Sequence, residues 1–129
     1  EPVLLYLPVD SLRPVALFMV LLAFIFIGAA KNETRLKQYV RHPQLTGLLV
    51  WSSAHLILNG DSSSVALFAG LGLWAAIEIP LISRREGAWV KPLVPSWGVE
   101  IPGQMISLVI FAVFLFAHPF IAGVPVFPR

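Results

Sequence analysis

The sequence predicts an all-α integral membrane protein, folded as a bundle of four transmembrane helices. Of its 129 residues, 57% are hydrophobic and only 12% are charged, whereas soluble domains carry about 25% charged residues. The mean hydropathy is +0.82, and the apolar residues fall in long blocks separated by turns and charged loops. This composition excludes a disordered chain, a nucleic-acid-binding module and an ordinary cytosolic enzyme domain. The expected surroundings are a lipid bilayer, and residues 1–129 are expected to form a single membrane domain.

The first expected span covers residues 12–30. After Arg13 it runs through uncharged residues rich in Leu, Phe, Val and Ile, and its length is near the lower limit of about 17 residues for crossing a bilayer. The apolar run ahead of it, residues 3–8, is too short to cross. We expect that run to lie at the membrane interface, where a tyrosine hydroxyl can remain hydrated.

The second expected span, residues 44–58, is short and contains small residues, including Gly47, that let helices approach closely. Residues 59–61 have the composition of a turn. The third span, residues 64–83, contains Pro80, which favours a kink. A polar loop with several prolines is expected to follow at 84–102.

The last expected span covers residues 103–121 and is followed by a short tail. The expected loops at 31–42 and 84–102 hold seven of the nine Lys and Arg residues, and only Arg13 and Arg129 lie elsewhere. With four spans these two loops share one side, and the positive-inside rule places that side in the cytoplasm. Both ends of the chain and the turn at 59–63 are then expected to face the periplasm or its equivalent.

Three ionisable residues are expected inside spans: His55, Glu78 and His118. Such residues are functional candidates because burying them in lipid is costly. His55 lies four residues before Asn59, so about 6 Å from the end of its span. His118 lies near the corresponding end of the last span. The two histidines are therefore expected at similar depth on different helices, where they can hold a metal ion or a haem iron.

A structural interpretation stays open for each histidine. His55 can hydrogen-bond to neighbouring backbone or to Ser52, and His118 also has the pattern of a helix end because a proline follows it. His42 is thirteen residues before His55, about 20 Å along a straight helix, so these two cannot share a metal ion. We expect His42 to be an interfacial cap beside the basic loop.

Glu78 is expected about 9 Å from the cytoplasmic end of its span, where Arg41 or His42 can pair with it. Trp51 and Trp74 lie within spans, where they line a pigment pocket or simply pack. The absence of cysteine excludes disulfides, iron–sulfur clusters and cysteine catalysis. No hydrolase triad, phosphate loop or dinucleotide-binding fingerprint is present. The residues leave open whether the chain is an enzyme, and any redox chemistry would belong to a bound cofactor.

The central residues form a specific pattern: an Arg-His-Pro, a glycine four residues after the proline, a tryptophan, an Ala-His-Leu and an Asn-Gly turn. In this sequence they are Arg41-His42-Pro43, Gly47, Trp51, Ala54-His55-Leu56 and Asn59-Gly60. The pattern resembles the signature of the NnrU family of bacterial membrane proteins. Residues 118–125 resemble the family's C-terminal HPxxxGVP, so the resemblance covers nearly the whole chain.

The resemblance implies a protein tied to nitrite and nitric oxide reduction in denitrifying bacteria. The family is related to 15-cis-zeta-carotene isomerase, an integral membrane haem b protein whose iron is ligated by histidine. His55 matches the histidine of the Ala-His pair, and the resemblance therefore implies that it ligates haem iron. Ser52 stands where the isomerase has a cysteine, and this departure argues against the same kind of ligand switching.

A second departure concerns the start of the chain. Family members carry about two further spans before the segment that corresponds to Val3, and one of these supplies another axial histidine in the isomerase. The chain is expected to be a fragment of a longer protein or a shortened variant. In a shortened variant His118 is the substitute ligand by depth, or haem is not bound.

Three functions remain open at this point. The first is a haem b-binding NnrU-like protein acting in nitrogen-oxide metabolism or redox isomerisation. The second is a carotenoid cis–trans isomerase that acts on an apolar polyene. The third is a structural or assembly subunit without chemistry, held by other membrane subunits. The expected ligands are accordingly a polyene or a small redox ligand, and no nucleic acid is expected.

Overall fold

The computed structural model describes residues 1–127 of the protein, and its secondary structure in that range is helical. Two short 3-10 helices precede α1 and α2. The four α-helices are α1 (Arg13–Ala29), α2 (Pro43–Leu58), α3 (Ser62–Glu86) and α4 (Trp97–Ala122). No strand forms within residues 1–127, where extended pairing is limited to an isolated bridge between Leu4 and Asp61. The prediction of an all-helical chain is confirmed for this range.

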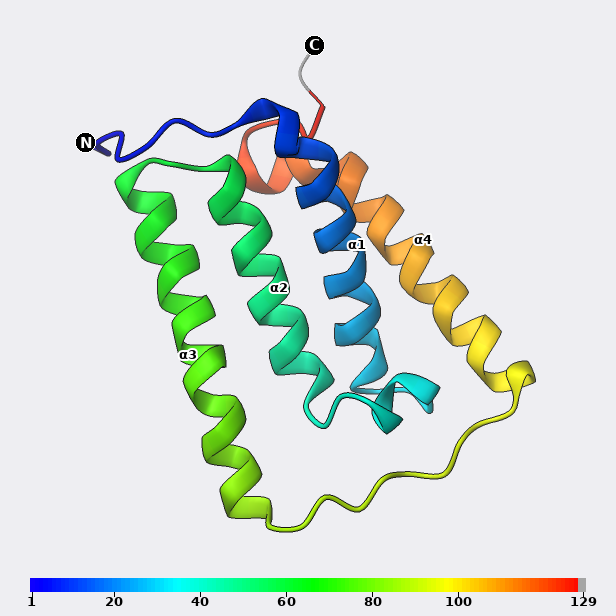
Figure 1. Cartoon of the computed structure of the whole chain (residues 1–129). Helices are drawn as coiled ribbons and strands as arrows, with labels where there is room; N and C mark the ends of the chain where they lie inside the picture. The colour runs from blue at the N-terminus through cyan, green and yellow to red at the C-terminus, as the bar shows by residue number, and fades with distance from the viewer. Residues whose placement is uncertain (128–129) are drawn as a thin grey trace.

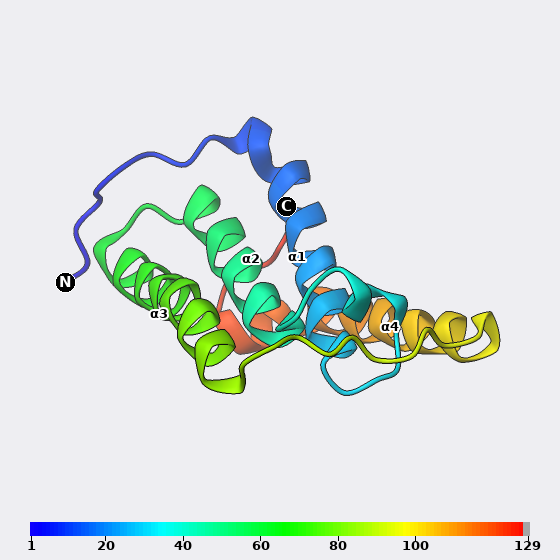
Figure 2. The same ribbon diagram turned by 60° about the horizontal axis from the view of Figure 1, so that its bottom comes forward.

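Consecutive helices run in opposite directions (Figure 1). Helices α3, α2 and α1 lie side by side in that order, and α4 packs against α1 and slants across one face of this row (Figures 1 and 2). We call the end that carries loops 30–42 and 87–96 the basic end. The other end carries residues 1–9, the turn at 59–61 and residues 123–127, and we call it the histidine end. The prediction that both basic loops share one end is confirmed, while Arg129 lies outside the described residues.

The bounds of α1 and α2 agree with the predicted spans to within one residue. The other two helices contain the predicted spans, residues 64–83 and 103–121, and extend beyond them. Helix α3 begins at Ser62 and continues through Arg84 and Arg85 to Glu86, not Ser83, because basic residues are well tolerated in a last turn. Helix α4 begins at Trp97 rather than residue 103, so the predicted loop at 84–102 shrinks to 87–96.

Three segments are long and apolar enough to cross a membrane: Asp10–Ala29, Ser62–Glu86 and Trp97–Ala122. These segments indicate a multi-pass membrane protein. Helix α2 has 16 residues, or about 24 Å at 1.5 Å per residue, which is shorter than a hydrocarbon core of about 30 Å. Length and composition therefore support three spans.

Small residues carry the contacts between helices. A Cβ added to Gly47 of α2 would lie 2.9 Å from the carbonyl oxygen of Ala23 in α1, and one added to Gly28 would lie 2.5 Å from Oγ of Ser107 in α4. Among residues 1–127, the buried apolar residues other than prolines and glycines are alanines: Ala16, Ala23, Ala29, Ala54 and Ala75. The helix backbones thus approach closely, as in membrane bundles.

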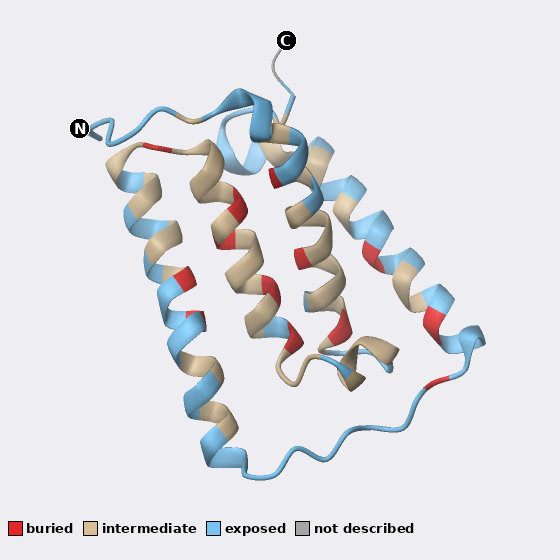
Figure 3. Cartoon of the chain, viewed as in Figure 1, coloured by how far each residue is buried: buried red, intermediate tan, exposed pale blue. Residues whose placement is uncertain are grey.

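Large apolar side chains instead point outward. The outer surfaces of α3 and α4 are mostly exposed (Figure 3). On α4 alone they include Met105, Val109, Val113, Phe116 and Phe120. A contiguous apolar surface of this extent is unfavourable in water and is favourable in lipid. The burial pattern therefore agrees with the composition in indicating a membrane protein.

Candidate functional site

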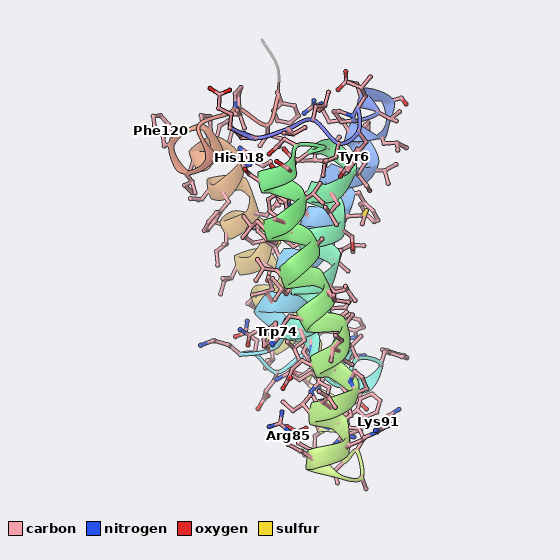
Figure 4. The ribbon with its side chains drawn as sticks, turned by 90° about the vertical axis from the view of Figure 1, so that its left-hand side faces the viewer. Tyr6, Trp74, Arg85, Lys91, His118 and Phe120 are labelled. Carbon is pink, nitrogen blue, oxygen red and sulfur yellow. The ribbon has the colours of Figure 1, made fainter. Side chains whose placement is uncertain are left out.

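His55 and His118 lie together at the histidine end. His55 is in the last turn of α2 and His118 is near the end of α4. Their ring centres are 6.5 Å apart and their ring planes differ by 22°. Figure 4 shows His118 at the same end as Tyr6, near the chain's N-terminal segment. The expectation that the two histidines share a depth on different helices matches this arrangement.

Each histidine uses one ring nitrogen for a backbone contact. Nδ1 of His55 is 2.9 Å from the carbonyl oxygen of Trp51, and Nδ1 of His118 is 2.6 Å from that of Val124. A carbonyl oxygen only accepts hydrogen bonds, so Nδ1 must carry the proton and donate it in both rings. Nε2 of each ring then has no backbone contact, and Nε2 is the atom through which a histidine with this Nδ1 contact binds a metal.

Aromatic side chains pack on His55. The rings of Trp51 and Phe68 lie 4.4 Å and 4.6 Å from the His55 ring, centre to centre, and Phe68 is stacked at 30°. Trp51 and Phe68 also contact each other, at 5.2 Å. The cluster therefore joins α2 and α3 and, through His118, α4. Its flat apolar walls limit the rotation of the His55 ring.

The segment after α4 holds His118 in place. Gly123 ends the helix with φ of +76°, a left-handed conformation that favours glycine. The chain then turns back, which brings the carbonyl of Val124 to His118. Arg13 of α1 donates to the carbonyl of Val126 at 2.9 Å and ties this returning segment to the first helix. The position of His118 is therefore set by three separate parts of the chain.

The N-terminal segment covers the end of α2. The hydroxyl of Tyr6 lies within hydrogen-bond distance of the carbonyl oxygens of Leu56 and Asn59, and the amide of Asn59 donates to the carbonyl of His55 at 2.7 Å. Gly60 makes this contact feasible, because an added Cβ would lie 1.9 Å from the carbonyl oxygen of Tyr6. Residues 3–6 thus close the histidine end over His55.

The family model for the NnrU protein matches residues 1–126. The chain belongs to the NnrU family. No curated protein and no solved structure matches it. The family pattern is spread along α2, with Arg41 and His42 at the basic end and His55 and Asn59 at the histidine end. These motif residues therefore lie at the two ends of α2 rather than around a single centre.

His42 occupies the N-cap position of α2, as expected, but its side chain does not cap the helix. Its Nε2 lies 2.9 Å from Oγ of Ser83 in α3. The expected pairing of Glu78 with Arg41 or His42 is wrong. Arg85, seven residues further along α3, binds Glu78 at 2.6 Å, because α3 continues past residue 83 and carries the arginine within reach.

A buried polar cluster at the basic end was missed, because Glu100 was expected in a loop. Its carboxylate accepts hydrogen bonds from the hydroxyl of Thr34 at 2.7 Å, the backbone amide of Arg35 at 2.8 Å and the side chain of Gln104 at 3.0 Å. Thr34 and Glu100 are both buried. The Glu100–Gln104 spacing of four residues is a helical signal that the two nearby prolines obscured.

Proposed function

We propose that this NnrU family protein crosses the bilayer four times and holds haem b between His55 and His118. In this proposal the protein acts in the bacterial inner membrane, and its basic end lies in the cytoplasm. The single observation that carries it is the pair of imidazoles 6.5 Å apart, each with Nδ1 bonded to a backbone carbonyl. Two metal–nitrogen bonds of about 2 Å and two ring radii of about 1 Å give a comparable separation of about 6 Å.

The number of ligands favours haem over a metal ion alone. Within residues 1–127, no three His, Cys, Asp or Glu side chains are grouped to hold a metal ion. Structural zinc needs four ligands and catalytic zinc usually three from protein. Haem would bring most of the iron's ligands itself and would need few from the protein, and His55 and His118 are the residues that would supply them. When bound, it would supply one-electron redox chemistry.

The surrounding residues have defined tasks in this proposal. The carbonyls of Trp51 and Val124 hold the Nδ1 protons and orient both rings, which raises the basicity of Nε2. Trp51 and Phe68 provide apolar walls for a flat porphyrin and exclude water. Tyr6 and the N-terminal segment cover the site from the outside. The link of the family to nitrite and nitric oxide reduction is proposed to run through the haem.

The fourth crossing follows from connectivity. Helices α1 and α3 both run from the histidine end to the basic end (Figure 1). If both cross the bilayer, α2 must return the chain across the same thickness, because it joins the end of α1 to the start of α3. Since α2 is packed between those two helices, its modest length is compensated by protein neighbours on both sides.

The optical spectrum of the purified protein tests the haem proposal. Expressed with haem supplied and extracted in mild detergent, the protein is expected to show a Soret band with the features of bis-histidine ligation. His55→Ala is expected to lose most of the haem, and His118→Ala is expected to shift the spectrum toward a five-coordinate form. His42→Ala is the matched control, because it removes a histidine at the other end of the same helix, and it should retain the band.

Two outcomes would overturn the proposal. No Soret band in the unaltered protein would remove haem and favour the assembly-subunit alternative, which a stable co-purifying membrane protein would then support. A band that survives in both His55→Ala and His118→Ala would leave haem bound but assign it to other ligands. An unchanged isomer ratio when the protein is co-expressed with a blocked carotenoid pathway would count against the polyene isomerase alternative.

A further inference from the structure

A cavity of about 560 Å³ lies at the basic end, one helix length from the histidines. It is open to one side and is lined by the first turn of α2, the last turns of α3 and residues of both basic loops. The residues that line it include Lys37, Arg41, Gln44, Leu45 and Trp89. Its volume falls within the range of about 300–1,000 Å³ that is usual for ligand sites. The proposed haem site makes no use of it.

Two cationic side chains line this cavity with unused donors. Arg41 is 19% exposed, and its ion pair within residues 1–127 is with Glu86 at 3.7 Å, too long for a hydrogen bond. Lys37 has one long contact, 3.5 Å from its Nζ to the carbonyl oxygen of Ala30. Glu86 is half exposed and offsets only one of the two charges. The side chains that line the cavity therefore carry a net positive charge and have unused hydrogen-bond donors, and both features favour binding of an anion.

The backbone at the start of α2 also favours an anion in the cavity. Gln44 and Leu45 are in the first turn of α2, where amides have no partner within the helix. His42, at the N-cap, makes no side-chain hydrogen bond to them, because its Nε2 is engaged by Ser83. Both residues line the cavity. The partial positive charge of a helix N-terminus thus acts in the same space as Lys37 and Arg41.

The cavity continues into an apolar groove. A second hollow of about 380 Å³ shares Gln44, Leu45 and Ile82 with the first. It extends toward the middle of the bundle along Leu48 of α2 and Trp74 of α3, and Figure 4 shows Trp74 along α3 above Arg85 and Lys91. Glu78 also lines the groove, but Arg85 neutralises its charge.

We propose that this cavity and groove bind one anionic phospholipid, with its phosphate headgroup beside Lys37 and Arg41 and an acyl chain along Leu48 and Trp74. Charge complementarity selects an anionic headgroup, and the adjoining apolar groove selects an amphiphile over a free anion. The site lies where the proposed spans meet the interface, at the level occupied by lipid phosphates. Trp89 in the cavity wall is typical of that level.

Native mass spectrometry of the delipidated full chain in detergent tests the proposal. The probes are phosphatidylglycerol and phosphatidylcholine with identical acyl chains, titrated separately. Phosphatidylglycerol is expected to bind at one site at least tenfold more tightly than phosphatidylcholine. In the variant K37Q/R41Q its affinity is expected to fall at least fivefold. The matched control is K31Q/R84Q, which removes the same charge from exposed positions at the same end and should change the affinity less than twofold.

Several results would overturn the lipid site. An equal loss of phosphatidylglycerol affinity in K37Q/R41Q and K31Q/R84Q would show non-specific electrostatic attraction to the basic end rather than a specific binding site. Equal affinity for the two lipids would remove the headgroup preference, and displacement of phosphatidylglycerol by millimolar inorganic phosphate would indicate a free-anion site. Should K37Q/R41Q fail to fold, K37Q alone, which breaks no ion pair, is expected to lower the affinity at least threefold. None of these measurements depends on haem.

Discussion

Glu100 shows how one residue fastens the first turn of α4 to the rest of the bundle. Its three hydrogen bonds reach Thr34 and Arg35 in the loop after α1 and Gln104 in its own helix. The guanidinium of Arg35 also lies 3.7 Å above the ring of Trp97 and donates to the carbonyl of Pro95. The start of α4 is therefore tied to the end of α1 by polar contacts, whereas the rest of α4 relies on apolar packing.

Replacing Glu100 by alanine is expected to destabilise the protein by about 3 kcal/mol, because two buried donors, the Thr34 hydroxyl and the Arg35 amide, would lose their acceptor at about 1–3 kcal/mol each. Unfolding in a mixed-micelle denaturant titration measures the loss. Glu100→Gln keeps one acceptor oxygen and should lose less. A loss below 1 kcal/mol for Glu100→Ala would show that these hydrogen bonds are replaced by water or lipid headgroups.

Residue-level chemistry was only partly predictable. The depth of His55 followed from helical rise, and its pairing with His118 followed from equal depth on different spans. The carbonyl partners did not follow, since Val124 reaches His118 only because Gly123 turns the chain back after α4. Glu78 was matched to the wrong arginine because its helix was taken to end too early. Distances along one helix can be calculated from a sequence, whereas a returning loop cannot.

At the scale of elements, glycine positions decide how closely the helices pack. Gly47 faces the backbone of α1, while Gly70 of α3 has nothing within 4 Å of an added Cβ. The sequence indicated that small residues of this kind promote close packing but did not show which of them are at a contact. Proline was the misleading signal in α4, because the helix continues through Pro102 although the missing amide of this residue removes one hydrogen bond.

Gly47→Ala is therefore expected to destabilise the α1–α2 pair by about 1–3 kcal/mol through overpacking against Ala23 and Ile27. Gly70→Ala is the matched control and is expected to be neutral or slightly stabilising, because alanine has the better helix propensity. Denaturant titration of both variants in the same detergent measures the difference. Equal behaviour of the two variants would mean that α1 and α2 separate easily enough to accommodate the methyl group.

At the scale of the whole molecule, four antiparallel helices place the two basic loops at one end and the histidines at the other. The sequence predicted this arrangement well, because seven basic residues fall in the two predicted loops, at 31–42 and 84–102, which an even number of helices separates. The slant of α4 could not be predicted from the sequence. It depends on side-chain contacts between α1 and α4, namely Gly28 with Ser107 and Phe24 with Phe111 and Phe114.

The four-crossing topology is testable because the chain contains no cysteine. Single cysteines placed at Glu33 and Ala88 are expected to react with a membrane-impermeant thiol reagent from one side of the membrane only. Cysteines at Val3 and Ser63 are expected to react only from the other side. Labelling of Glu33→Cys and Ser63→Cys from the same side would show that α2 does not cross. Detergent-solubilised protein, in which all four sites should react, provides the control.

The shortness of α2 has a consequence for how the protein is made. Helices α1, α3 and α4 are apolar enough to partition into lipid one at a time as they leave the ribosome. Helix α2 is the least able to do so, yet it carries His55 and one wall of the lipid cavity. In the proposed topology, α2 is stable in the bilayer only once α1 and α3 lie on either side of it. The proposed lipid site therefore forms only after the third helix has been synthesised, and the proposed haem site only after the fourth, which carries His118.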